Sequence, residues 1–129
     1  MVKRTFLCLI ILSAILGGCK KNTDTGKFIQ APCPLKLPAE LLESDKFLFG
    51  HMEVPELSDQ PNRKTIELAI AIFKCKSDSA IQDPIVLSAG GPGLSNIDDF
   101  VPKLAGGLGN LFLYNRDVVV IETRGLKYS

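Results

Sequence analysis

The chain is poor in the residues on which several classes of protein depend. Its 129 residues include no tryptophan and a single histidine, and its lysines and arginines occur in runs of no more than two. With a formal net charge of +1 and no basic cluster, the sequence lacks the electrostatic signature of a nucleic-acid-binding protein. We therefore expect no nucleic-acid partner, and the 46% hydrophobic and 22% charged content indicates a globular domain.

Motifs that bind phosphate groups are also missing. No glycine is followed by Lys-Ser or Lys-Thr, as a P-loop requires. The segment 91–96 (Gly-Pro-Gly-Leu-Ser-Asn) lacks the third glycine of the dinucleotide fingerprint, and Pro92 removes a backbone donor. We predict no cofactor and no metal site.

The longest apolar run near the N-terminus is too short to cross a bilayer. Residues 6–16 form an eleven-residue apolar stretch behind Lys3 and Arg4, whereas a spanning helix needs about 20 residues. This pattern is typical of a signal peptide. Residues 16–19 (Leu-Gly-Gly-Cys) resemble the lipobox of bacterial lipoproteins, which implies cleavage before Cys19 and a lipid on its thiol. The alternative is an ordinary signal peptide with an incidental cysteine.

These features predict three regions and a location. Residues 1–18 form the signal peptide, 19–32 the lipid anchor and a polar tether, and 33–129 a folded domain. The expected location is the bacterial cell envelope, with the membrane contacted through the lipid on Cys19. Of the other cysteines, Cys8 is removed with the cleaved signal peptide. Cys33 and Cys75 remain in the mature protein, in a compartment that permits disulfides. They either pair or stay as two free thiols.

The first half of the domain predicts an antiparallel hairpin. Residues 47–54 alternate moderately, and residues 65–76 alternate clearly, with Ile66, Leu68, Ile70 and Ile72 on one face. The polar segment 58–62 between them consists largely of residue types that favour turns. Residues 35–43 are expected to contain one turn of helix.

The second half predicts a βαβ unit. Residues 85–87 and 117–121 indicate buried strands, the first covered on both faces. Residues 97–104 indicate a short helix, with Asn96 as its expected N-cap. Asp98 and Asp99 would lie near its positive end, and Pro102 is expected to bend or shorten it. A flexible break is expected at 106–110. Strand, helix and strand imply a parallel pair, and segments 88–95 and 122–129 follow its carboxyl ends, where ligands bind in such sheets.

The glycine loop at residues 88–95 is the most informative segment. Gly90, Gly91 and Gly93, together with Pro92, make a sharply bent loop without bulky side chains. Such a loop either is a structural turn or presents backbone N–H groups that stabilise an oxyanion.

Three segments together resemble the proline iminopeptidase and tripeptidyl aminopeptidase-like branch of the α/β-hydrolases. They are residues 50–55 (Gly-His-Met-Glu-Val-Pro) with the alternating strand 65–72, residues 90–93 (Gly-Gly-Pro-Gly), and residues 116–125, which end in Glu-Thr-Arg-Gly. The resemblance implies that Gly91 donates to an oxyanion and that Gly90 and Gly93 shape the loop. It also implies a structural role for Arg124, paired with Glu122 or Asp117, against the alternative of a solvated charge.

The sequence also departs from the family pattern. Ser88 and Ala89 stand where the family has histidine, no Gly-x-Ser-x-Gly elbow occurs, and His51 lies on an early strand, where a sheet histidine is expected. We therefore predict no catalytic residue in this chain and no activity by itself. The expected fold class is α/β, the N-terminal half of an α/β-hydrolase (an antiparallel hairpin leading into a parallel sheet), truncated after about the fourth strand.

The resemblance implies that full-length relatives are serine aminopeptidases acting on peptides. The alternative is a small surface lipoprotein that serves as a non-catalytic binding module.

Overall fold

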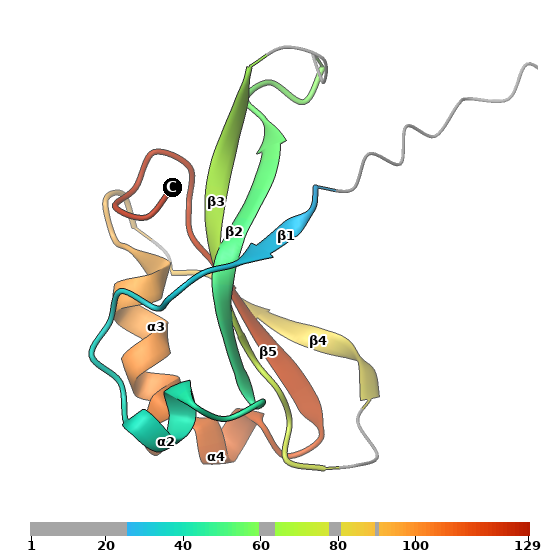
Figure 1. The fold of residues 1–129 in the computed structure, drawn as a ribbon, viewed down its shortest axis with the longest axis vertical. Coiled ribbons are helices and arrows are strands. Elements are labelled where there is room, and N and C mark those ends of the chain that lie inside the picture. Colours follow the sequence, from blue (N-terminus) through green and yellow to red (C-terminus); the bar gives the residue numbers. More distant parts are fainter. Residues whose placement is uncertain (1–25, 60–63, 78–80, 90) are drawn as a thin grey trace, which may run out of the picture.

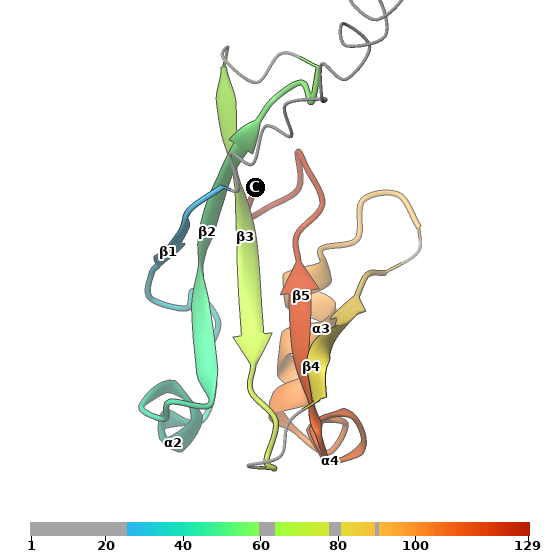
Figure 2. The ribbon, with the colours of Figure 1, turned by 90° about the vertical axis from the view of Figure 1, so that its right-hand side faces the viewer.

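The computed structural model describes residues 26–59, 64–77, 81–89 and 91–129 of the chain. Five strands form one mixed sheet in the order β1-β2-β3-β5-β4. The three described helices all lie on the same side of this sheet (Figures 1 and 2). The fold is therefore α/β. The expected signal peptide, with Cys19, lies outside the described residues.

The predicted hairpin is confirmed. β2 (Phe47–Pro55) pairs antiparallel with β3 (Thr65–Phe73) along the full length of both strands, from Phe47 opposite Phe73 to Pro55 opposite Thr65. Alternation places the polar side chains of β3 on one face and its isoleucines and Leu68 on the other.

A short first strand adds to the hairpin. β1 (Phe28–Gln30) pairs antiparallel with β2, within the segment expected to be a polar tether. Gly50 permits this close approach, because a Cβ there would lie 2.3 Å from the carbonyl oxygen of Ile29. The ordered sheet thus begins before residue 33.

The predicted βαβ unit is also confirmed. β4 (Ile81–Leu87), α3 (Asn96–Ala105) and β5 (Arg116–Ile121) follow one another, and β4 pairs parallel with β5. β5 lies between β4 and β3 and pairs antiparallel with β3. This one strand joins the hairpin to the parallel pair.

The expectation that the third strand is covered on both faces is wrong. β4 begins at Ile81, earlier than predicted, and forms the edge of the sheet. Val86 is 58% exposed, since all the described helices lie on the other side of the sheet. The apolar run 85–87 reflects an edge strand with one uncovered face.

The core lies between the sheet and α3. Its buried residues are Phe47, Phe49, Ala69, Ala71, Phe73, Val118 and Val120 from the sheet, Ile97, Val101 and Leu104 from α3, and Leu113 after α4. The α3 residues recur every three or four positions, so they share one helix face. Pro102 lies inside α3 on its exposed side.

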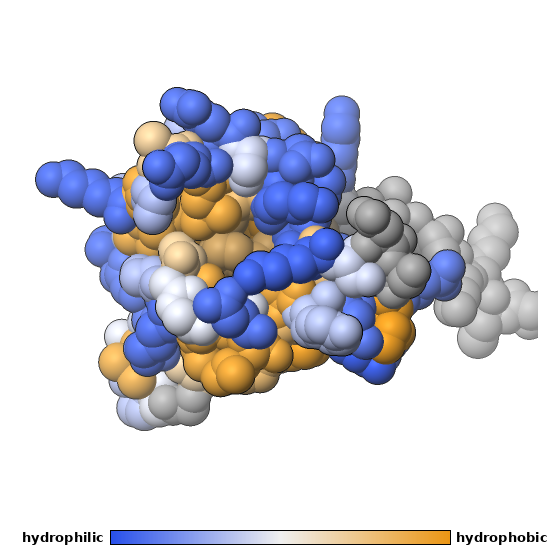
Figure 3. Space-filling model, turned by 90° about the horizontal axis from the view of Figure 1, so that it is seen from below, coloured by the Kyte–Doolittle hydropathy of each residue, from blue (hydrophilic) through white to orange (hydrophobic). Residues whose placement is uncertain are grey.

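Two short helices close the lower end of the molecule. α2 (Ala39–Leu42) lies in the segment predicted to contain a helical turn, and α4 (Gly109–Phe112) lies where a flexible break was predicted. Gly109 allows α4 to pack closely, because a Cβ there would lie 2.3 Å from the carbonyl oxygen of Leu104. Apolar residues reach the surface among charged ones at this end (Figure 3), and Leu42 and Leu111 are exposed.

Candidate functional site

The glycine loop connects β4 to α3 at the carboxyl end of the parallel pair. Gly91 has φ 112° and Gly93 has φ 84°, both in the left-handed region that favours glycine. A side chain at either position would therefore strain the backbone. Gly90, expected to shape the same loop, lies outside the described residues.

The backbone N–H of Gly91 is an available donor. Within the described part of the chain, it has no hydrogen-bond partner. The neighbouring N–H of Ala89, by contrast, donates to Oδ1 of Asn96 at 2.8 Å. Among the residues described, the N–H of Gly91 is thus unpaired at the place where the resemblance implies an oxyanion donor.

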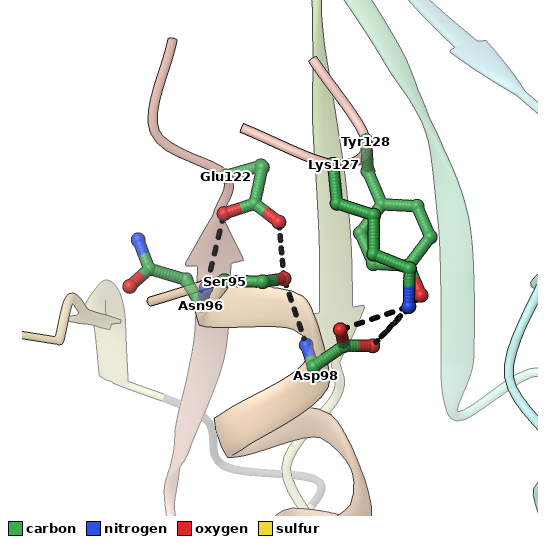
Figure 4. A network of polar contacts seen from close by, with 6 residues as sticks. All are labelled: Ser95, Asn96, Asp98, Glu122, Lys127 and Tyr128. Atoms are coloured by element: carbon green, nitrogen blue, oxygen red, sulfur yellow. Dashed lines mark hydrogen bonds and ion pairs between the residues drawn. The ribbon is translucent and has the colours of Figure 1, made fainter. Parts of the chain in front are cut away.

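Glu122 holds the start of α3 against the end of β5. Glu122 is 2% exposed, and its carboxylate accepts hydrogen bonds from the Ser95 hydroxyl at 2.5 Å and the Asn96 N–H at 2.9 Å (Figure 4). It accepts a third from the Thr123 N–H at 3.1 Å. A buried carboxylate needs such donors to offset its loss of hydration. Two of these partners belong to the first residues of α3, where the positive end of the helix favours a negative charge.

Ser95 and Asn96 have different roles from the predicted one. The expectation that Asn96 caps the helix is wrong, because the Ser95 hydroxyl accepts the Asp98 N–H at 3.1 Å and forms the N-cap. Asn96 is buried, and its side-chain amide donates to the carbonyl of Ile121 at 2.7 Å. Since Asn96 also accepts from Ala89, it connects the ends of β4 and β5.

A cavity of about 370 Å³ lies beside the loop. Gly93, Leu94 and Ser95 line one side of it, and Asp98 and Lys127 are also part of its wall. Asp98 accepts hydrogen bonds from the Tyr128 hydroxyl at 2.7 Å and the Lys127 ammonium at 3.0 Å. These donors, Tyr128 first and then Lys127, hold the pKa of Asp98 below its ordinary value. The carboxylate next to the loop is therefore paired with a cation.

The described residues contain no nucleophile and base arranged for covalent catalysis. The Ser95 hydroxyl is engaged by Glu122 and Asp98. His51 lies on β2, where its ring meets the Phe49 ring edge-on with centroids 5.6 Å apart. No group of three potential metal ligands occurs among the residues described. The site supplies a backbone donor without the groups that would generate an oxyanion.

The pairing expected for Arg124 is wrong. Its guanidinium donates to the carbonyl of Glu56 at 2.7 Å and is exposed. Glu122 already has three donors, and Asp117 accepts the N–H of Cys75 at 2.8 Å, so both expected partners are otherwise engaged.

Cys33 and Cys75 are both free thiols in the structure. Cys75 is buried after β3, and Cys33 is half-buried before α2. Burial raises the pKa of the Cys33 thiol, which keeps it in the protonated, unreactive form.

Sequence reasoning overlooked the network that holds the loop. The spacing of Ser95 and Asp98 resembles the start of a capping box and could have identified the true N-cap. The burial of Glu122 and Asn96 has no comparable local signal, because the contacts that join α3 to the end of β5 link residues more than 20 positions apart in sequence.

Comparisons of the chain with protein-family models, with curated proteins and with solved structures gave no match. Among the described residues, no helix has the length and apolarity needed to span a membrane.

Proposed function

We propose that this chain is the N-terminal part of an exported, lipid-anchored α/β-hydrolase whose full-length form is a serine aminopeptidase. The N–H of Gly91, which has no hydrogen-bond partner among the described residues, is the observation that carries the proposal. It lies in a left-handed glycine loop between a parallel strand and the following helix. An oxyanion donor of an α/β-hydrolase comes from a loop in this position.

The surrounding contacts support this role for the loop. Asn96 anchors Ala89 near the start of the loop, and Glu122 anchors Ser95 at its end. A preorganised donor stabilises a developing negative charge without first having to reorganise, which is the main requirement for an oxyanion hole. The antiparallel hairpin leading into a parallel pair also agrees with the arrangement that the resemblance implies.

The chain by itself is proposed to be inactive. Acyl transfer by this class of enzyme needs a serine on a nucleophile elbow and a histidine base, and the sequence contains neither an elbow nor a histidine other than His51. The expected result is no hydrolysis of aminoacyl or ester chromogenic substrates above background by the purified chain. Turnover well above background would contradict this prediction, whether it is kept or lost in His51→Ala.

The reading frame beyond the codon for Ser129 tests the hydrolase assignment. We expect it to continue into a Gly-x-Ser-x-Gly elbow followed by an acidic residue and a histidine. A frame that stops there in an intact transcript, combined with sharp cooperative unfolding of the purified chain, would overturn the proposal in favour of a small non-catalytic binding module.

Lipid attachment at Cys19 is tested separately. Cells expressing the chain should incorporate labelled palmitate into it, and Cys19→Ser should abolish the label, because a hydroxyl does not replace the thiol in this modification. Cys33→Ser serves as the matched control and should keep the label. Equal labelling of wild type and Cys19→Ser would exclude this anchor.

A further inference from the structure

The N-terminal segment joins the sheet at the end that carries the glycine loop. β1 begins at Phe28, which lies opposite Met52 of β2, and Met52 in turn lies opposite Leu68 of β3. β5 ends at Ile121, opposite Ile70 of β3. The start of β1 is therefore level with the carboxyl end of β5 to within about 7 Å. In Figure 1, β1 begins well away from α2 and α4, which lie at the other end of the sheet.

Gly26 fixes the point at which this segment meets the sheet. A Cβ at residue 26 would lie 2.2 Å from the carbonyl oxygen of Glu53, so glycine is needed for this close approach to β2. Further along, the N–H of Ala31 donates to the carbonyl of Phe49 at 2.9 Å. Residues 26–31 are therefore held against β2 and do not belong to the polar tether expected from the sequence.

The chain between the expected anchor and the sheet is consequently short. Only residues 20–25, which we call the tether, separate Cys19 from Gly26. A stretch of this length spans at most about 25 Å, whereas a tether that continued to residue 32 would span about 45 Å. A lipid on Cys19 thus keeps Gly26 close to the bilayer surface. Residues beyond 129 do not change this limit, because it is set by the chain before β1.

The short tether disfavours a domain that stands on its other end. From the level of Glu53 to Phe47, β2 runs about 20 Å towards the end closed by α2 and α4. The helices, turns and side chains at that end add to this distance, so an inverted domain would need an almost fully extended tether. Such extension costs the conformational entropy of every tether residue. With the glycine loop towards the bilayer, no extension is needed.

We propose that the glycine-loop end of the sheet faces the membrane that holds the lipid of Cys19. The partner is the bilayer surface, and the exposed Leu94 of the loop lies at the end of the domain nearest to it. A peptide that reaches the N–H of Gly91 would enter between the domain and the bilayer. This inference rests on the lipid anchor of the proposed function and does not rest on the hydrolase assignment.

Energy transfer from tryptophan to a labelled lipid tests the proposal. The chain has no tryptophan, so a single introduced one is the sole donor. Leu94→Trp places it in the glycine loop and Leu111→Trp in α4, and both leucines are exposed, so neither change disturbs the core. The lipidated full chain is placed in phosphatidylcholine vesicles that contain dansyl-phosphatidylethanolamine. Because α3 alone separates the two positions by about 15 Å, we expect roughly twofold or more transfer from Leu94→Trp relative to Leu111→Trp.

A longer tether is the matched control. An insertion of about fifteen glycines and serines between residues 25 and 26 raises the limit to about 80 Å and should remove most of the difference between the two positions. A difference of the same size after the insertion would overturn the proposal, because the orientation would then not come from the short tether.

Palmitate incorporation by the same variants separates two kinds of failure. In protein that carries the label, equal transfer from the two positions, or greater transfer from Leu111→Trp, would overturn the orientation and leave the anchor in place. Protein without the label would overturn the anchor itself and this inference with it.

Discussion

At the scale of single residues, Glu122 and Asn96 decide how the glycine loop is held. Glu122 is a buried carboxylate, and no lysine or arginine of the described residues forms an ion pair with it. Its charge is stabilised by a hydroxyl and two backbone N–H groups. Hydrogen bonds to charged groups are stronger than those between neutral groups, so this single side chain has a large effect on the start of α3.

Replacing Glu122 tests this role. Glu122→Ala leaves the donors of Ser95, Asn96 and Thr123 without an acceptor and should lower the free energy of unfolding by about 3 kcal/mol. Glu122→Gln keeps one acceptor oxygen and should cost about 1 kcal/mol. The measurement is urea unfolding of the purified variants. Glu56→Ala, at an exposed carboxylate, is the control, and a similar loss for Glu56→Ala and Glu122→Ala would contradict the argument.

The sequence predicted the conformation of the loop glycines better than the contacts that hold the loop in place. Glycines 91 and 93 adopt the left-handed conformations that their type allows, and sequence alone indicated a sharply bent loop there. Asn96 was expected as a cap, because Asn is a common N-cap and precedes the apolar run. The contacts of Asn96 with Ala89 and with the distant Ile121 assign it a different role, and the contact with Ile121 forms only when α3 packs against the end of β5.

At the scale of elements, β1 depends on one glycine of its neighbour. Any Cβ at position 50 would lie 2.3 Å from the Ile29 carbonyl oxygen and 2.7 Å from the ring of Phe28. The first contact is with backbone, so it cannot be relieved by rotation of a side chain. β1 can pair with β2 only because residue 50 has no side chain.

Gly50→Ala should therefore detach β1. We expect faster hydrogen exchange at the N–H of Ala31, which donates to the carbonyl of Phe49 at 2.9 Å. The free energy of unfolding should fall by about 1–3 kcal/mol, as for other overpacked sites. The amides between β2 and β3 should keep their protection. Unchanged exchange at Ala31 would show that the sheet accommodates the methyl group.

The segment after β5 is tied to α3 through Asp98. Lys127 and Tyr128 both donate to this carboxylate, and their hydrogen bonds lower its pKa (Figure 4). A lowered carboxyl pKa in the folded state contributes stability that is present above the unfolded pKa and is lost as the pH falls through the folded value. The side chains of Asp98 and Lys127 are 40% and 59% exposed, so the contribution is small.

This contact predicts a pH-dependent difference between wild type and Asp98→Asn. At pH 7 the wild type should be more stable by up to about 1 kcal/mol. The difference should shrink as the pH falls below 3.8, the ordinary value for an aspartate. Chemical unfolding of both proteins across this range measures it. A difference that is the same at pH 7 and pH 2.5 would contradict the linkage, and Lys127→Met in both backgrounds should reduce it.

At the scale of the whole molecule, the chain has two unlike faces. α3, α2 and α4 cover one side of the sheet and enclose the core, whereas no helix of the described residues covers the other side. The five-stranded order places β5 between a hairpin strand and β4, so one sheet combines antiparallel and parallel pairs.

The sequence by itself determined the elements that depend on local pattern. Alternation specified the hairpin, helical spacing and acidic residues specified α3, and glycine content specified the bent loop, because each follows from neighbours within a few residues. Only the tertiary structure decided the order of the strands, the exposed edge at β4, the burial of Glu122 and the partner of Arg124. These depend on contacts between residues distant in sequence, and their energies arise only once the sheet has formed.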